Sequence, residues 1–201
     1  MRYLVFDTET GGLNPLSNPL MSVGAILLDG ELNEISQHYA LFQNLWGRSV
    51  TQRAKEVNGI DETRLKSALL PAEFYPTWDS LTNQADVLIA HNVAFDIGFM
   101  QSNGFACDAD KTLDTMHIAW DVWPRPQKAG LSACYKRVLG VEPSNAHNAL
   151  SDAKMVTVLL EWFVENGHLS LPLPHYPVVP NFYEERAFGY VKMKEMGLIN
   201  D

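Results

Sequence analysis

Apolar residues in the first part of the chain follow a pattern typical of strands. Residues 2–6 (RYLVF) are rich in β-branched and aromatic side chains, and Leu20–Leu28 alternates small and apolar residues up to the turn signal Asp29-Gly30. Residues 35–43 have the composition of a returning strand. These three segments predict an antiparallel meander.

Helical spacing appears next along the chain. Residues 51–58 and 71–83 each predict a helix, and in the second one Phe74, Trp78 and Leu81 recur at intervals of three or four on a single face. An apolar face of this kind packs against a core. We therefore expect the second helix to cover the sheet.

The middle of the chain alternates short strands with helices. Residues 86–90 (DVLIA) form a continuous apolar run, which is typical of a strand buried on both faces. Residues 94–102 predict a helix that ends at Asn103-Gly104, and Thr112–Asp114 predicts a short strand. The expected fold is an α/β fold with a mixed five-stranded sheet, antiparallel in its first strands and parallel afterwards, flanked by helices.

Two more helices are expected before the C-terminal region. Leu131–Leu139 follows a proline-containing loop at residues 123–126, and the long pattern Ala149–Glu165 ends at Asn166-Gly167. Prolines then recur at 172, 174, 177 and 180, which predicts an extended connection, and residues 182–197 predict a last amphipathic helix. We expect one domain over residues 1–168 and a tail over 169–201 packed on or beside it.

Composition narrows the class of protein. A chain of 201 residues that is 46% hydrophobic and 19% charged can bury a sizeable core. Its net charge of −9 argues against a broad DNA-coating surface, which requires clustered Lys and Arg. Apolar runs are too short for a secretory signal or a membrane helix, and Cys107 and Cys134 match no metal or disulfide spacing. These features predict a cytoplasmic protein without a membrane partner.

Two carboxylates lie at the end of the first predicted strand. Asp7 and Glu9 are two positions apart, so on a strand they point to the same face. Close carboxylates raise each other's pKa unless a cation lies between them, and hard oxygen ligands suit Mg²⁺ or Mn²⁺. In isolation this D-x-E pattern is also typical of an ordinary polar strand end.

Two other acids occur near helix starts. Asn92, after the buried strand, is placed to cap the next helix, and Asp96 lies in its first turns, where the helix dipole alone could explain it. His147 directly precedes the long helix, and Asp152 lies just over one turn inside it. Burying Asp152 among apolar neighbours requires a partner or a metal, although an N-terminal aspartate is also an ordinary feature.

The three motifs D-x-E, H-N-x-x-F-D and H-x4-D, in this order over about residues 2–165, resemble those of the DEDDh (DnaQ-like) 3′–5′ exonucleases of the ribonuclease-H-like superfamily. The resemblance implies a ribonuclease-H-like fold. It also implies that Asp7, Glu9, Asp96 and Asp152 hold two divalent ions, Mg²⁺ or Mn²⁺, and that His147 is the general base. Paired ions of this kind can activate water and stabilise the leaving oxygen of a phosphodiester.

The same resemblance suggests substrate contacts. It implies that Thr8 and Thr10 belong to the segment that recognises the terminal 3′-OH, that Leu13 wedges against the last base, and that Ile60 is a second apolar clamp. Ordinary packing explains Leu13 and Ile60 equally well. Asn92 could bind the substrate backbone or only cap its helix.

The function implied is hydrolysis at the 3′ end of single-stranded or frayed nucleic acid, with release of nucleoside 5′-monophosphates. DNA is the expected substrate. The residues leave open an exoribonuclease that trims short RNA, because nothing in the sequence reveals a pocket that reads a 2′-OH. They also leave open a non-catalytic scaffold associated with a polymerase, and both a homodimer and a polymerase or repair partner.

Overall fold

The computed structural model describes residues 1–60, 62–123, 129–144 and 146–180. Most of the loop predicted at 123–126 and all of the helix predicted at 182–197 lie outside these ranges. Within the described chain, no helix is both long enough and apolar enough to cross a bilayer. Cys107 and Cys134 are free thiols.

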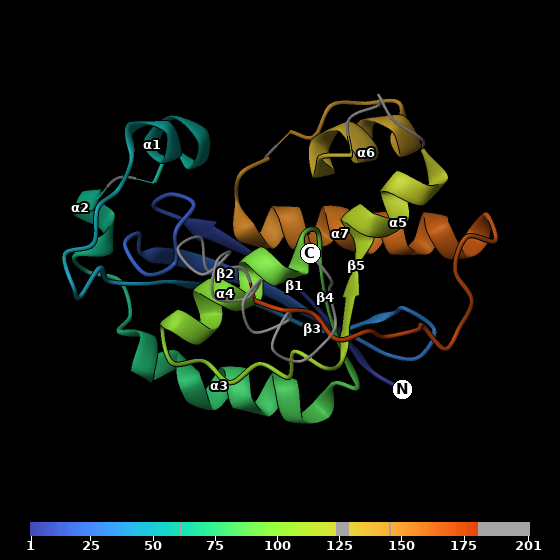
Figure 1. Ribbon diagram of the computed structural model, residues 1–201, viewed down its shortest axis with the longest axis horizontal. Helices are drawn as coiled ribbons and strands as arrows, with labels where there is room; N and C mark the ends of the chain where they lie inside the picture. Colours follow the sequence, from blue (N-terminus) through green and yellow to red (C-terminus); the bar gives the residue numbers. More distant parts are fainter. Residues whose placement is uncertain (61, 124–128, 145, 181–201) are drawn as a thin grey trace, which may run out of the picture.

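A mixed five-stranded sheet forms the centre of the molecule (Figure 1). Its strands are β1 (Tyr3–Thr10), β2 (Leu20–Leu28), β3 (Glu34–Leu41), β4 (Val87–Ala90) and β5 (Thr112–Asp114). They lie in the order β3-β2-β1-β4-β5, with β1–β2 and β2–β3 antiparallel and β1–β4 and β4–β5 parallel. The predicted sheet is confirmed.

Seven helices are seen in the described ranges. They are α1 (Gln52–Asn58), α2 (Glu62–Leu65), α3 (Pro71–Gln84), α4 (Val93–Ser102), α5 (Thr115–Val122), α6 (Leu131–Leu139) and α7 (Ala149–Glu165). The sequence patterns did not predict α2 and α5. A single turn such as α2 is too short for periodicity to be detectable, and α5 begins on the carboxylate of Asp114, which accepts the Met116 N–H.

The two faces of the sheet pack against different helices. Leu4 and Phe6 of β1 belong to a core cluster with α3 and α4, where the rings of Phe6 and Trp78 lie edge to face at 5.3 Å. Tyr3 and Val5 belong to a second cluster with α7. Figure 1 shows α7 and α3 on opposite sides of the sheet. Alternation along one strand therefore assigns β1 side chains to two separate helical layers.

The central strand β1 extends beyond its parallel neighbour. Pairing with β4 ends at Val5, opposite Ile89, whereas β1 continues to Thr10 and stays paired with β2 over that length. The second half of β1 thus has one open edge. That edge faces the start of α4, which follows β4 directly.

Helix α7 starts unusually close to β2. A Cβ built on Gly24 would lie 2.2 Å from the backbone nitrogen of Leu150 and 2.3 Å from the carbonyl carbon of Ala149. Gly24 is paired with Asp7 across the sheet. Only a glycine at this position allows the first turn of α7 to approach the acid-bearing part of β1.

The proline-rich connection packs along the edge of the sheet. Thr112 of β5 and Tyr176 exchange backbone hydrogen bonds of 2.7 and 3.1 Å, and the buried Leu173 donates its N–H to the Tyr3 hydroxyl at 3.0 Å. The connection therefore covers the outer edge of β5. The proposed domain boundary near residue 168 remains a prediction.

We expect Gly24→Ala to lower the free energy of unfolding by about 1–3 kcal/mol, the usual range for forcing extra atoms into a packed contact. Urea unfolding measures the change. Gly130→Ala is the matched control, because a Cβ there meets no atom of the described residues within 4 Å; its helix-capping loss is about 1 kcal/mol or less. Equal losses in the two variants would contradict the close approach of α7.

Candidate active site

The acids predicted on the first strand lie in its open-edged half. Asp7 and Glu9 follow Tyr3 and Val5 in the alternation of β1, on the face that α7 covers. Glu9 is buried, and Asp7 is partly exposed. The strand geometry therefore places both carboxylates beneath the start of α7, as the two-residue spacing predicts.

Asp96 joins β1 from α4, on the other side of the sheet. Its Oδ1 accepts the Thr8 N–H at 3.0 Å and the Thr8 hydroxyl at 2.7 Å, and the residue is only 3% exposed. The Thr8 N–H belongs to the edge that β4 leaves unpaired. Asp96 thus completes the hydrogen bonding of β1 and holds α4 against it.

The start of α4 is capped by a carboxylate from β5, and not by the Asn92 side chain that the sequence suggests. Asn92 occupies the N-cap position with a φ of 82°, and its side chain makes no capping hydrogen bond, so the predicted side-chain cap is wrong. The buried Asp114 at the end of β5 instead accepts the N–H groups of Asn92 and Val93 at 2.9 and 3.2 Å. This distant carboxylate therefore positions the helix that carries Asp96.

His147 and Asp152 form one local unit at the start of α7. The His147 N–H donates to both Asp152 carboxylate oxygens at 3.2 Å. His147 has a φ of 68°, a left-handed conformation that is uncommon for a side chain of this size. Asn148 caps the helix by accepting the Ser151 N–H at 3.2 Å. His147 is exposed at this turn, whereas Asp152 is 8% exposed.

Three of the predicted residues lie close enough to share a cation. One ligand atom from each of Glu9, His147 and Asp152 lies within 4.8 Å of the others. Asp7 and Asp96 fall outside this tight group, but the charges of Asp96, Asp152 and Glu9 raise the pKa of Asp7, and the charge of Asp96 also raises that of Glu9. The structure therefore brings together all five residues that the sequence motifs predicted, from β1, α4 and the start of α7.

Every acid of the group has a raised pKa. Burial, followed by the charges of Asp96, Asp152 and Glu9, raises the pKa of Asp7 well above its usual range. Burial and neighbouring acids raise the pKa of Glu9 to about 8. Burial raises the pKa of Asp96 to about 7 against the opposing Thr8 hydrogen bonds, and that of Asp152 to about 6 against its hydrogen bond from His147. Such a cluster favours binding protons or cations.

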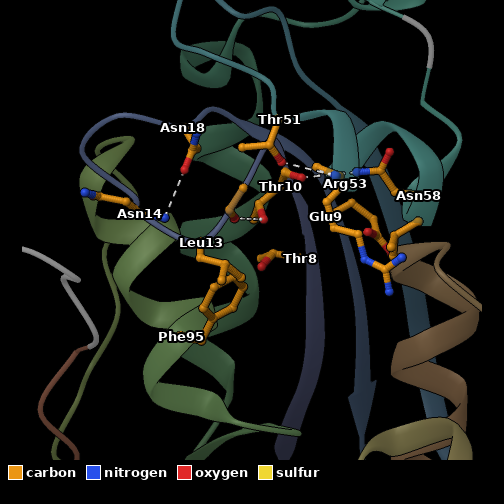
Figure 2. Close-up of a pocket in the computed structure, with 13 residues that line it drawn as sticks. Thr8, Glu9, Thr10, Leu13, Asn14, Asn18, Thr51, Arg53, Asn58 and Phe95 are labelled. Atoms are coloured by element: carbon orange, nitrogen blue, oxygen red, sulfur yellow. Dashed lines mark hydrogen bonds between the residues drawn. The ribbon is translucent and has the colours of Figure 1, made fainter.

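A pocket of about 850 Å³ opens beside Glu9 (Figure 2). Thr8 and Thr10 line it from β1, and Leu13 lines it from the following loop with 61% of its surface exposed. Phe95 of α4 lines the same pocket, and Figure 2 shows it on the same side as Leu13. An exposed leucine and an aromatic ring in one pocket with a buried acid can hold a flat apolar group.

The structure places Ile60 outside the lining of this pocket. Ile60 is 8% exposed and packs with Met21 and Leu65. Val57 and Asn58 of the same segment line the pocket instead, and the Asn58 amide donates to the Thr10 carbonyl at 3.1 Å. Contact between Ile60 and a terminal base thus remains a prediction that this packing does not support.

Sequence reasoning missed several residues at the pocket. Phe95 stands inside the H-N-x-x-F-D motif and lines the pocket, so the motif itself was a signal for it. Arg53 lines the pocket from α1, and Asp114 supports α4 from outside the pocket. Arg53 had no distinctive pattern around it, and the role of Asp114 requires knowing that β5 lies next to β4.

Comparison with known proteins decides the family. The model of an exonuclease family, RNase_T, matches residues 4–160. The chain belongs to this exonuclease family. The DEDDh resemblance is confirmed, and the motif residues lie in the part of the chain that matches.

Relatives of this exonuclease domain include much longer proteins. DNA polymerase III PolC-type of Streptococcus mutans is 30% identical over 169 residues, which are 82% of this chain and 11% of that protein. DNA polymerase III PolC-type of Clostridium perfringens is 30% identical over 166 residues, which are 80% of this chain and 11% of that protein. The chain thus spans about a tenth of the length of these curated relatives.

Solved structures confirm the exonuclease fold. E. coli Exonuclease I, in complex with a dT13 oligonucleotide, has a TM-score of 0.68 at 19% identity, with 99% of this chain and 46% of that chain covered. The nuclease domain of 3'hExo, a DEDDh family member bound to rAMP, has a TM-score of 0.69 at 14% identity, with 85% and 95% covered. The ribonuclease-H-like architecture predicted from the motifs is therefore present.

The raised pKa values predict a pH-dependent stability of the metal-free exonuclease. The folded state holds protons that the unfolded chain has already released, so the free energy of unfolding falls as the pH rises from about 4 through about 8. We expect wild type in EDTA to lose at least about 1.4 kcal/mol more than Glu9→Gln between pH 5 and pH 8.5, the equivalent of one pKa unit.

Urea unfolding at each pH measures this difference. Glu34→Gln serves as control, because Glu34 lies exposed on β3, away from the acids. The control should follow wild type. Parallel pH profiles for wild type and Glu9→Gln would show that the acids do not destabilise one another.

Proposed function

We propose that this exonuclease hydrolyses nucleic acid from the 3′ end, with two divalent ions as cofactors and His147 as general base, releasing nucleoside 5′-monophosphates. The convergence of Asp7, Glu9, Asp96 and Asp152 from three separate elements, with raised pKa values, carries the proposal. Such a group destabilises the folded state unless cations neutralise it. The four acids therefore contribute to cation binding and not to the stability of the fold.

The residues of the cluster fit Mg²⁺ or Mn²⁺. Carboxylate oxygens are hard ligands, and four of them balance the charge of two divalent ions. Asp7, Glu9, Asp96 and Asp152 would hold the ions, which would supply Lewis-acid activation of water and neutralisation of phosphate charge. Thr8 fixes Asp96 and the His147 N–H fixes Asp152, so both carboxylates are oriented before a ligand arrives.

His147 is the proposed base that removes a proton from the attacking water. Two observations support this role: a ring nitrogen of His147 lies within 4.8 Å of carboxylate oxygens of Glu9 and Asp152, and His147 is exposed. An imidazole nitrogen can accept a proton from a water molecule and pass it on to solvent. The left-handed turn at His147 keeps the ring outside α7 and close to the acids.

The pocket favours a substrate with a free single-stranded end. Leu13 and Phe95 offer apolar surface for one base, while Thr8 and Thr10 line the floor beside the acids. A base can occupy this space only after it leaves its pairing partner. The 3′ polarity is inferred from the DEDDh family, and DNA is the favoured substrate because the PolC-type relatives are DNA polymerases. The same relatives support action beside a polymerase.

Purified protein should shorten 5′-labelled single-stranded DNA stepwise in Mn²⁺ or Mg²⁺ and release mononucleotides, because the oriented acids require cations to act. EDTA should stop the reaction, and Asp7→Ala should lower it at least about 1,000-fold. Denaturing gels resolve the products. Matched RNA, duplex and mismatched primer substrates identify the preferred end. Absence of mononucleotides from DNA and RNA would exclude the enzymatic function.

His147→Ala should lower kcat about 100- to 10,000-fold, the usual contribution of a general base. Its affinity for Mn²⁺, measured by titration calorimetry, should change little, because the four carboxylates remain. Asp152→Asn is the contrasting variant and should weaken Mn²⁺ binding. An equal loss of Mn²⁺ affinity in His147→Ala would identify His147 as a ligand.

A further inference from the structure

Helix α1 stands beside the pocket without contributing to the core. None of its residues is buried. The helix is tied at both ends to the end of β1 and the residue after it: the Thr51 N–H donates to the Gly11 carbonyl at 2.7 Å, and the Asn58 amide donates to the Thr10 carbonyl at 3.1 Å. Both attachments lie within two residues of Glu9. The position of α1 is thus fixed relative to the acids.

Local capping also stabilises α1. The Thr51 hydroxyl accepts the Ala54 N–H at 3.1 Å, and Gly59, with a φ of 60°, donates its N–H to the Lys55 carbonyl at 3.1 Å. A helix of this length does not persist alone in water. Its two caps and two attachments therefore serve to present one side of the helix to the pocket, through Arg53, Ala54 and Val57.

Arg53 is the cation on that side. Among the residues that line the pocket, the charged ones are Glu9 and Arg53. Arg53 is exposed, and within the described ranges it has no hydrogen bond or ion pair. Figure 2 shows its side chain extending from α1 on the side of the pocket where Glu9 lies. The helix fixes the backbone of Arg53 beside the pocket, and its guanidinium is available for an anionic ligand.

The net charge of the protein favours such a contact. The chain carries a net charge of −9, and the site concentrates four acids. A polyanionic strand is repelled by this field unless it meets cations on its way in. A third of the 15 Lys and Arg residues of the sequence fall at 48, 53, 55, 64 and 66, around α1 and α2. Of these, the pocket lining includes Arg53.

We infer that Arg53 binds a phosphate of the substrate strand upstream of the scissile bond, and that α1 is the carrier that holds it there. The inference rests on the proposed nuclease function. The scissile phosphate must lie at the carboxylates, so a guanidinium on the α1 wall meets the next part of the backbone. Because phosphates carry no base identity, Arg53 contributes affinity for any sequence.

Arg53→Gln tests the contact against Arg64→Gln, an exposed arginine of α2 outside the pocket lining. Binding of a labelled eight-nucleotide single strand in Ca²⁺ is measured by anisotropy, and turnover is measured in Mn²⁺. We expect Arg53→Gln to weaken binding and raise KM about tenfold, with kcat changed about twofold or less. Arg53→Lys should recover part of the loss. Arg64→Gln should stay within about twofold of wild type.

Two further measurements identify the phosphate that Arg53 binds: the salt dependence of Kd, and binding of substrates in which one phosphate is replaced by an uncharged methylphosphonate. Removing one phosphate contact should reduce the slope of log Kd against log salt by about 0.7 for a single strand. Substrates with one methylphosphonate at successive linkages should bind wild type and Arg53→Gln equally at a single upstream position. Parallel loss on every substrate, equality only at the scissile linkage, or an Arg64→Gln effect as large would overturn the inference.

The two proposals fail separately. If wild type binds the strand but releases no mononucleotide, the nuclease function fails while the comparison of Arg53 and Arg64 variants in binding still holds. If wild type is active and Arg53→Gln matches it in KM and Kd, only the role of Arg53 fails. Thermal unfolding of each variant checks that the fold is intact, and Arg53→Lys retains the positive charge on α1.

Discussion

The hydrogen bonds between Thr8 and Asp96 are the interaction on which the site depends. Because β1 extends past the end of β4, its second half has backbone groups without a strand partner. Asp96 takes the place of that partner by accepting the Thr8 N–H and hydroxyl. One carboxylate thereby completes the sheet edge and brings α4 to the strand that carries Asp7 and Glu9. An unpaired buried N–H would otherwise destabilise β1.

On the opposite face of the sheet, the close approach of α7 to β2 is a second constraint. Gly24 lets the first turn of α7 contact β2 beside Asp7, which brings Asp152 and His147 to the acids. This arrangement concentrates carboxylates in a site with little solvent. Burial and repulsion between the acids destabilise their charged forms, and this raises their pKa values. Stability given up here is recovered in the apolar clusters on both sides of the sheet.

Much of the fold was predictable because its signals are local. The apolar run of β4 and the spacing in α3 and α7 identify their elements without tertiary information. Asn92 shows where this approach fails: its residue type favours capping, but Asp114 from a strand distant in sequence does the capping instead. Ile60 packs in a cluster with Met21 and lies outside the pocket lining, which local sequence could not reveal, and its contact with a base remains a prediction.

The sequence by itself determined the family, the five strands, five of the seven described helices and the five residues expected at the centre, because residue spacing fixes which side chains share a local face. Only the tertiary structure decided how these faces meet. The open edge of β1, the glycine contact beneath α7 and the attachment of α1 to Thr10 and Gly11 join segments far apart in the chain. Such contacts depend on packing between elements, which no local pattern encodes.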